Sequence, residues 1–317
     1  MKAALTLLLL AVLATLPFWL DDAYLLHVVI ITGIFIIAAM SLNLLLGFAG
    51  QLSLGHVAFF GIGAYASSLV ALGFKLTTPF EITVAPNPVW LAMLAGMLAA
   101  GLAGWFIGRI AFKVRGAYFV IVSISFAEVM RLVAVNWLEL TQGPMALNNI
   151  PPLELFGHAF WKKPENYWLV LAVAVFSYIL IRRLVHSRAG RAMIALAENE
   201  ALATSVGIDV TRYLVLAAVV SAAIAGAAGA LYAHYVRIVD PDVFLFVYTV
   251  TMVIMVVTGG KGTLAGPVVG GLIFGLLPEG LRAMAIAPEM RWIAYGILMV
   301  LVVYFLPVGI VPALRRR

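Results

Sequence analysis

The sequence predicts an all-α protein that crosses a membrane many times. Hydrophobic residues make up 64% of the 317 positions, charged residues make up only 11%, and the mean hydropathy is +1.10. Soluble proteins carry roughly 25% charged residues, so a soluble fold could not hide this much apolar surface. The apolar residues also come in runs long enough to span a bilayer, which takes about 20 residues as a helix. We expect one transmembrane domain over residues 1–317, with about ten helices and a possible range of eight to ten.

Ten apolar segments are candidates for these helices. Three of them, at 53–73, 243–259 and 265–281, are short or rich in glycine, so we expect bent, broken or re-entrant segments there. The first segment follows Lys2 and is similar to a signal peptide, but no small-residue cleavage site follows it, and we interpret it as a retained helix. The ten segments are residues 3–20, 24–46, 53–73, 89–112, 117–136, 167–185, 213–236, 243–259, 265–281 and 292–310.

The basic residues orient these segments. Lys and Arg concentrate in short cytoplasmic loops. If the loop at 182–212 is cytoplasmic, the count of ten places both chain termini and the basic cluster at 109–115 on the same side. That side then holds most of the 20 Lys and Arg residues, and most acidic residues fall outside. We therefore predict cytoplasmic termini and two long external loops, at 74–88 and 137–166. The second is interpreted as a docking surface for an external partner or as an ordered connector.

The loop at 182–212 is a long polar interruption with a helical pattern. Its apolar positions recur at helical spacing, which predicts a short amphipathic helix on the cytoplasmic face. Glu198 and Glu200 fall near the middle of this helix, and Gly207 follows it where a helix would stop. The apolar stripe needs a partner, either lipid or another protein. The residues of the stripe are Met193, Leu196, Ala197, Ala201, Leu202 and Ser205.

Residues 41–65 combine glycines with polar side chains inside an apolar region. Five glycines between Gly47 and Gly63 permit close approach between helices. Polar groups at membrane depth face protein or a cavity, so they either line a pathway or bond neighbouring helices. The sequence leaves both options open for four side chains: Asn43, Gln51, Ser53 and His56.

Glu128 and Arg131 are charged residues within a predicted span. Glu128 lies thirteen residues after Arg115, or roughly 20 Å along a helix at about 1.5 Å per residue. Arg131 is one turn further, close enough on the same face to pair with it. The pair is interpreted either as a structural ion pair or as part of the outer pathway, where it would meet the ammonium and carboxylate groups of a zwitterionic substrate.

Several other site types do not fit the sequence. The stretch at 259–263 is similar to a phosphate loop, but Gly262 occupies the Ser/Thr position after Lys261, and we predict no nucleotide site. The 5 histidines are scattered and the chain has no cysteine, so we predict no metal site, no cofactor and no catalytic residue. The net charge of +6 has no basic stripe with aromatics, and no nucleic-acid binding is predicted.

Four stretches together resemble one family. Residues 41–65, the loop from Gly190 to Tyr213, the segment at 117–131 and the glycine-rich turn at 259–270 are similar to motifs of the branched-chain amino-acid ABC transporter permeases of the LivM type. The resemblance runs from about residue 40 to 275. Its combination of motifs is specific to the family, although no single motif is.

The resemblance implies a subunit of an importer in a bacterial or archaeal inner membrane. Its partners would be membrane lipid, a second homologous permease, two ATPase subunits that bind ATP, and an external substrate-binding protein. The loop at 182–212 would couple the ATPases to this chain, and Arg188 and Arg191 would either help docking or only set topology. The candidate coupling residues are Arg188, Gly190, Arg191, Glu198, Asn199, Glu200 and Gly207.

Two departures leave the substrate open. The family tends to carry a Gly-Gly-rich turn where this chain has residues 141–146, and Lys261 is unexpected in the later turn. The family also includes permeases for urea, amides and other amino acids. Two further hypotheses are a stand-alone secondary transporter or channel, for which Glu128 would be the coupling carboxylate, and a membrane enzyme, which the missing motifs disfavour.

Overall fold

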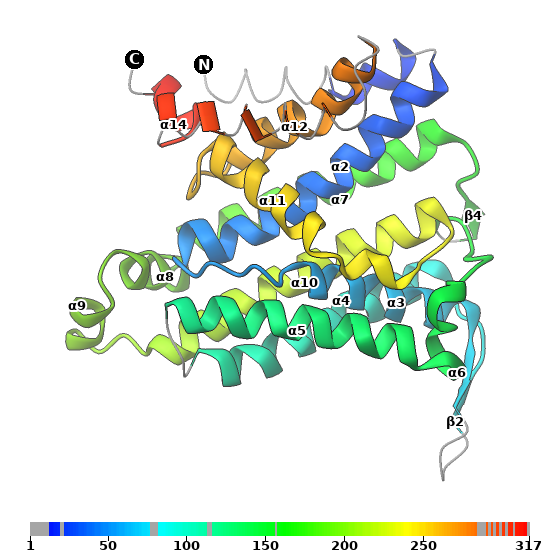
Figure 1. Cartoon of the computed structure of the whole chain (residues 1–317), viewed down its shortest axis with the longest axis horizontal. Coiled ribbons are helices and arrows are strands. Elements are labelled where there is room, and N and C mark those ends of the chain that lie inside the picture. The colour runs from blue at the N-terminus through cyan, green and yellow to red at the C-terminus, as the bar shows by residue number, and fades with distance from the viewer. Residues whose placement is uncertain are drawn as a thin grey trace.

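The computed structural model of the chain is an elongated bundle of helices (Figure 1). It describes residues 13–19, 22–76, 82–112, 116–155, 157–283 and 308–315, together with positions 290, 293, 296, 297, 300, 301 and 304–306. The helices are α2 (Ala23–Asn43), α3 (Val57–Leu72), α4 (Val89–Ala111), α5 (Ala117–Asn136), α6 (Leu138–Thr141), α7 (Lys163–His186), α8 (Arg188–Glu198), α9 (Glu200–Ser205), α10 (Val210–Val236), α11 (Phe246–Gly259), α12 (Gly266–Ala283) and α14 (Ile310–Arg315). Short 3-10 turns are η1 (Leu16–Phe18), η3 (Gly143–Met145) and η4 (Pro241–Phe244), and η2 (Leu44–Phe48) is π-helical.

Five of the helices are long and apolar enough to cross a membrane. These are Ala23–Phe48, Val89–Ala111, Tyr118–Asn136, Lys163–His186 and Val210–Val236. Three shorter apolar helices, Val57–Leu72, Phe246–Gly259 and Gly266–Leu277, coincide with the three segments expected to be short or broken. The all-α, multi-span prediction is confirmed for eight of the ten segments. The segments at 3–20 and 292–310 lie partly outside the described residues, so neither can be followed as one helix.

Helices α3, α4 and α10 pack together around glycines. A Cβ on Gly63 of α3 would collide with the backbone of Gly226 in α10, and one on Gly96 of α4 would collide with the backbone of Gly63. Three helices can therefore approach closely at one level, as small residues allow in membrane bundles. Helix α2 lies against α10 and carries a run of fully buried side chains that includes Ile34 and Ile37. Helices α2, α3 and α10 form the centre of the bundle, and α4 packs on α3 and α10 while its other face, which carries Leu98 and Leu102, stays exposed in the single chain.

The remaining spans cover this centre. Helix α7 packs on α2, and α11 and α12 pack on each other and on α2. Helix α5 touches α3 and η4 and keeps a broad face exposed in the single chain. Side-chain caps fix where two spans begin, because Asp22 accepts a bond from Tyr24 N–H and Asp209 accepts one from Arg212 N–H.

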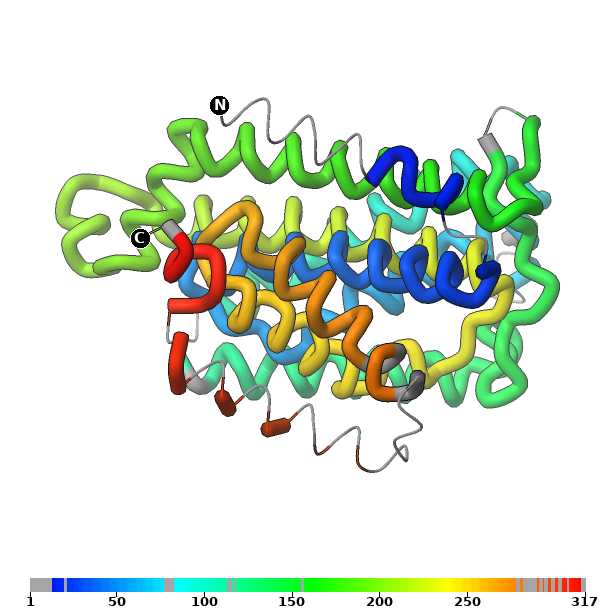
Figure 2. Tube along the Cα trace, turned by 90° about the horizontal axis from the view of Figure 1, so that it is seen from above, coloured from blue at the N-terminus to red at the C-terminus, as the bar shows by residue number. Residues whose placement is uncertain are grey.

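One end of the bundle carries the connectors. Two antiparallel hairpins lie there: β1 (Phe74–Leu76) pairs with β2 (Ile82–Val84), and β3 (Glu154–Leu155) pairs with β4 (His158–Ala159). Leu147 forms a bridge with Val239, and Ile150 and Leu153 are fully buried. The connector at 137–166 is thus ordered against the C-terminal end of α10 over its described residues. At the opposite end, α8 and α9 project beyond the spanning helices (Figure 2).

Candidate functional site

Helix α8 is anchored to the bundle by one face. Ser187 caps its first turn by accepting a bond from Gly190 N–H at 3.2 Å. Gly190 lies directly on the last carbonyls of α7, where a Cβ would collide with the oxygens of Leu184 and Val185. Met193 and Leu196 are buried in a cluster with side chains from α4, α5 and α10. A glycine at position 190 therefore allows α8 to turn tightly away from α7 and lie against α10 and η2.

The prediction of one helix through residue 205 is wrong, because the helix breaks at Asn199. Asn199 ends α8 and begins α9 in extended backbone, and its side chain accepts a bond from Leu202 N–H at 3.0 Å. Asn side chains bond nearby backbone groups and so favour helix ends over helix interiors. Gly207 ends α9 as expected, with a φ of +86°. The segment predicted to couple, residues 188–205, is therefore a pair of short helices.

The break divides the predicted apolar stripe. Met193 and Leu196 are buried, but Leu202 is 65% exposed and Val206 is 72% exposed. The predicted stripe therefore does not form one continuous face. The exposed side chains of α9 stand beside Glu198, which is also exposed, and Glu200, which is half-buried. The result is a projecting surface that mixes apolar and acidic groups.

The arginines of this segment lie at the surface. Arg188 and Arg191 are both exposed. Arg191 donates a bond from its guanidinium to the carbonyl oxygen of His186 at 3.0 Å, so it caps the last turn of α7. This contact gives Arg191 a local structural role, because it provides a hydrogen-bond donor for a carbonyl at the end of a helix.

The polar residues predicted in the first glycine-rich stretch bond neighbouring segments. Asn43 accepts a bond from Gly262 N–H and donates one to the Thr263 carbonyl, both at 2.9 Å. His56 is fully buried, with its Nε2 atom 2.8 Å from Ser41 Oγ. Ser53 is buried and Gln51 is half-buried. The structure therefore places Asn43 and His56 in helix packing.

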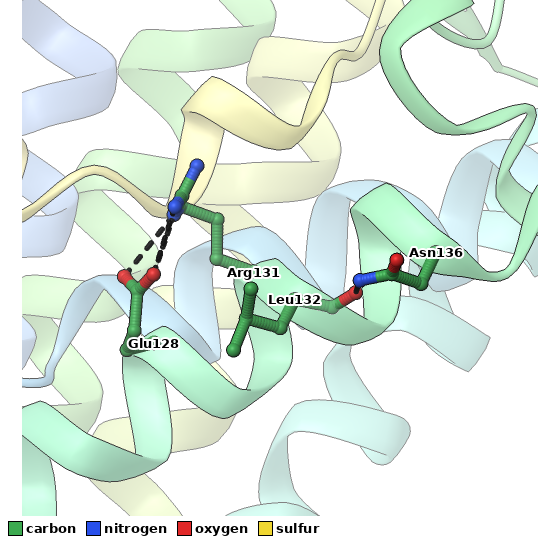
Figure 3. A network of polar contacts seen from close by, with 4 residues as sticks. All are labelled: Glu128, Arg131, Leu132 and Asn136. Atoms are coloured by element: carbon green, nitrogen blue, oxygen red, sulfur yellow. Dashed lines mark hydrogen bonds and ion pairs between the residues drawn. The ribbon is translucent and has the colours of Figure 1, made fainter.

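Glu128 and Arg131 form the predicted ion pair (Figure 3). The shortest contact is 2.8 Å, between Arg131 Nη2 and Glu128 Oε1, and Arg131 Nε donates to both carboxylate oxygens. The side chains are 52% exposed for Glu128 and 28% exposed for Arg131. Asp242 of η4 also acts electrostatically on Arg131. The pair thus lies at an open surface of the single chain, within a helix of membrane-spanning length.

Sequence reasoning missed Ser123, which joins two segments. Its Oγ accepts bonds from Leu54 N–H at 3.1 Å and Gly55 N–H at 3.3 Å, and donates one to the Val120 carbonyl at 2.8 Å. The only available signal was a serine inside an apolar helix. Among the described residues, no three His, Asp or Glu side chains lie together as a metal site would need.

Comparison with known proteins identifies the family. Residues 24–303 match the family described as "Branched-chain amino acid transport system / permease component". The chain is 31% identical to the high-affinity branched-chain amino acid transport system permease protein LivM of Salmonella typhimurium, over 90% of this chain and 69% of that protein. It is 27% identical to the permease protein LivH of Escherichia coli K12, over 86% and 89% of the two chains.

An archaeal relative extends this likeness. The probable branched-chain amino acid transport permease protein LivM of Methanocaldococcus jannaschii is 26% identical over 88% of this chain and 91% of its own length. No solved structure matches the chain. Because the family match and the LivM likeness both cover most of the sequence, the chain belongs to the family of permease components of branched-chain amino acid transport systems.

Proposed function

We propose that this chain is the membrane-spanning permease subunit of an ABC importer for branched-chain or similar hydrophobic amino acids. The observation that carries the proposal is the family match over residues 24–303. The five long apolar helices provide the membrane domain. ATP binding and hydrolysis belong to separate subunits, since the glycine-rich turn at 259–263 departs from the phosphate-loop pattern.

The ATPase subunits dock on α8 and α9. This segment projects from one end of the bundle (Figure 2) and exposes Leu202 and Val206 beside Glu198. Apolar anchors with a charged rim suit a protein partner better than open water. The opposite face of α8 is buried through Met193 and Leu196 among α4, α5 and α10. Helix α8 contacts α7, α10 and η2, so a force applied to α8 by the ATPases would reach these segments directly.

The translocation pathway runs along the exposed face of α5. A charged pair facing lipid is costly, and such groups in membrane proteins face a bundle interior or an aqueous cavity. Glu128 and Arg131 are exposed on α5 in the single chain, so a second subunit is needed to cover them. Relatives of this chain carry the names LivM and LivH, which supports a second, homologous permease as that subunit. The pair would then meet the ammonium and carboxylate groups of an amino acid.

Transport follows from alternating access in the cytoplasmic membrane. A binding protein outside the cell delivers the substrate and supplies the specificity. ATP binding draws the two ATPases together and moves α8, and the pathway opens to the other side. The side bearing α8 and α9 is cytoplasmic in this proposal, and the distribution of Lys and Arg along the sequence predicts that both termini lie on that side.

Co-purification tests the proposal. The chain is co-expressed with the genes that neighbour it and purified through a tag, and bound proteins are identified by mass spectrometry. We expect ATPase subunits and a second permease. The complex, reconstituted in liposomes with the binding protein, should then take up leucine, isoleucine or valine when ATP is present inside. Uptake of urea or short amides alone would place the chain in another branch of the family. Recovery of the chain alone, with ion-driven uptake, would overturn the proposal and make Glu128 the coupling residue.

A further inference from the structure

A non-helical link, buried at half of its positions, joins α2 to α3. The link covers residues 49–56, between the π-helical turn η2 and the first residue of α3. Ala49, Ser53, Gly55 and His56 are buried. Irregular backbone at membrane depth persists only where protein or a cavity covers it, and its polar groups need partners. The partners of this link therefore show which helices hold it in place.

The first contact of the link is with α8. Gly50 has a φ of +69° and lies against Ala197, the penultimate residue of α8. A Cβ built on Gly50 would be 3.0 Å from both the Cα and the Cβ of Ala197. Glycine suits this position for two reasons: it adopts a left-handed backbone without strain, and its lack of a Cβ lets the backbone come close to Ala197. The link and the end of α8 are consequently in direct van der Waals contact.

The second contact is with α5. Ser123 Oγ accepts bonds from the backbone N–H groups of Leu54 and Gly55. A Cβ on Gly55 would collide with the carbonyl of Ser123, so the two backbones also touch. The hydroxyl donates to the Val120 carbonyl and accepts two bonds, which uses all three of its hydrogen-bonding positions. Glu128 follows Ser123 by five residues along α5, or about 7.5 Å at the rise of an α-helix.

A third contact holds the end of the link. Thr249 of α11 accepts a bond at 3.1 Å from Val57 N–H, the first residue of α3. Two backbone N–H groups of the link and the first N–H group of α3 thus donate hydrogen bonds to side-chain hydroxyls of neighbouring helices. Without Ser123, the N–H groups of Leu54 and Gly55 would lose these acceptors, and an unpaired buried polar group costs about 1–3 kcal/mol.

We propose that residues 49–56 carry the movement of α8 to α5, with Ser123 as the positioning residue that ties the link to α5. The proposal rests on the function proposed above, because it concerns the path by which ATPase movement reaches the exposed face of α5. Its geometric basis is the chain of contacts from Ala197 to Gly50, along the link to Gly55, and from Gly55 to Ser123.

The first test removes the hydrogen bonds between the hydroxyl of Ser123 and the link. Ser123→Ala and the control Ser125→Ala, an exposed serine on the same helix, are compared in the complete complex in liposomes. For Ser123→Ala we expect unchanged ATPase co-purification and unchanged ATP hydrolysis. The amount of amino acid taken up per ATP hydrolysed should fall about fivefold or more, fivefold being the lower end of the range by which coupled sites usually affect one another. Ser123→Thr, which keeps the hydroxyl, should restore the ratio. An unchanged ratio in Ser123→Ala, or an equal loss in Ser125→Ala, would overturn the proposal.

The second test joins the link to α8 and remains informative if Ser123→Ala does not fold. The chain has no cysteine, so Gly50→Cys with Ala197→Cys introduces one defined pair. A Cβ built on Gly50 would lie 3.0 Å from the Cβ of Ala197. The Cβ atoms of a disulfide are about 3.5–4.5 Å apart, so the bond forms once the two backbones separate by about 0.5 Å. If the link and α8 move together, the oxidised pair forms and uptake continues. Failure to form the disulfide, or uptake that is lost on oxidation and regained with a reductant, would contradict the proposal. The single-cysteine chains are the controls.

These tests separate the inference from the proposed function. If no ATPase co-purifies with the unaltered chain, the proposed function is wrong, whatever the variants do. If the unaltered complex transports an amino acid at the expense of ATP and the variants behave like their controls, the function stands and the coupling path alone is wrong.

Discussion

The side-chain amide of Asn43 holds the backbone of Gly262, 219 residues later in the chain, at 2.9 Å. The same amide donates to the carbonyl of Thr263, so one residue at the end of α2 satisfies both a donor and an acceptor of the turn between α11 and α12. A Cβ on Gly47 would also collide with Gly262, so the two segments are in close contact there. Asn43 therefore joins the central helix α2 to the α11–α12 pair.

Replacing Asn43 with alanine should destabilise this junction. The change leaves the half-buried N–H of Gly262 and the half-buried carbonyl of Thr263 without these partners. The loss costs at most the roughly 1–3 kcal/mol of a fully buried unpaired group, for each of them. We expect a lower midpoint of thermal unfolding for the purified chain in detergent. Asn136→Ala is the control, because Asn136 is exposed and bonds only the carbonyl of Leu132, one turn earlier. Equal midpoints of thermal unfolding for the two variants would show that the hydrogen bonds of Asn43 do not stabilise the contact between α2 and the turn that joins α11 to α12.

Removing one charge of the α5 pair should lower uptake. Glu128→Gln leaves Arg131 without its ion partner at membrane depth, where an unpaired charge is costly. We expect reduced transport in the reconstituted complex, measured with labelled amino acid. The control is Glu139→Gln, which changes an exposed carboxylate beyond the end of α5.

The exchanged pair separates packing from transport. Glu128→Arg with Arg131→Glu keeps both charges on the same face but reverses their order. If the pair only stabilises α5, both membrane insertion and uptake should recover. If it orients a zwitterion, insertion measured by fluorescence-detected size exclusion should recover while uptake stays low. Full uptake by Glu128→Gln itself would exclude any role of the pair in transport.

ATPase docking should depend on the exposed side chains of α9. Leu202→Asp removes an apolar anchor that is 65% exposed and adds a charge beside Glu198 and Glu200. We expect less ATPase to co-purify, with normal insertion of the chain, and the same direction for Glu200→Arg. Met145→Asp is a matched control, because Met145 is 83% exposed on η3, in the connector at the opposite end of the bundle. Unchanged recovery of ATPase with Leu202→Asp would move the docking surface away from α9.

The positions of the spans could be predicted because single-residue properties determine them. Apolar length locates α2, α4, α5, α7 and α10 within a few residues of the expected segments. The ion pair of Glu128 and Arg131 was also predictable, since spacing along one helix is local information.

The tertiary contacts could not be predicted in the same way. Ser123 and Gly55 are 68 residues apart in the chain, and nothing in their local sequence says that they touch. The bonds of Asn43 likewise depend on how α11 and α12 lie against α2. The break at Asn199 was missed for a different reason, since the apolar spacing continued through it while the asparagine side chain ended the helix. The spacing of apolar residues shows which face of a helix would be buried. It does not show whether an asparagine side chain will bond a backbone N–H and end the helix.

The capping role of Asn199 can be tested by hydrogen exchange. Asn199→Ala removes the acceptor for Leu202 N–H, a loss that typically costs about 1 kcal/mol of helix stability. Helix α9 is only 6 residues long, so its amides should exchange faster in the variant, while the amides of α8 beside buried Met193 should not change. Asn199→Asp keeps a side-chain oxygen at the cap and should exchange like the unaltered chain. If alanine produced a continuous helix from α8 into α9, exchange across position 199 would slow instead, and the break would have to be attributed to residues other than Asn199.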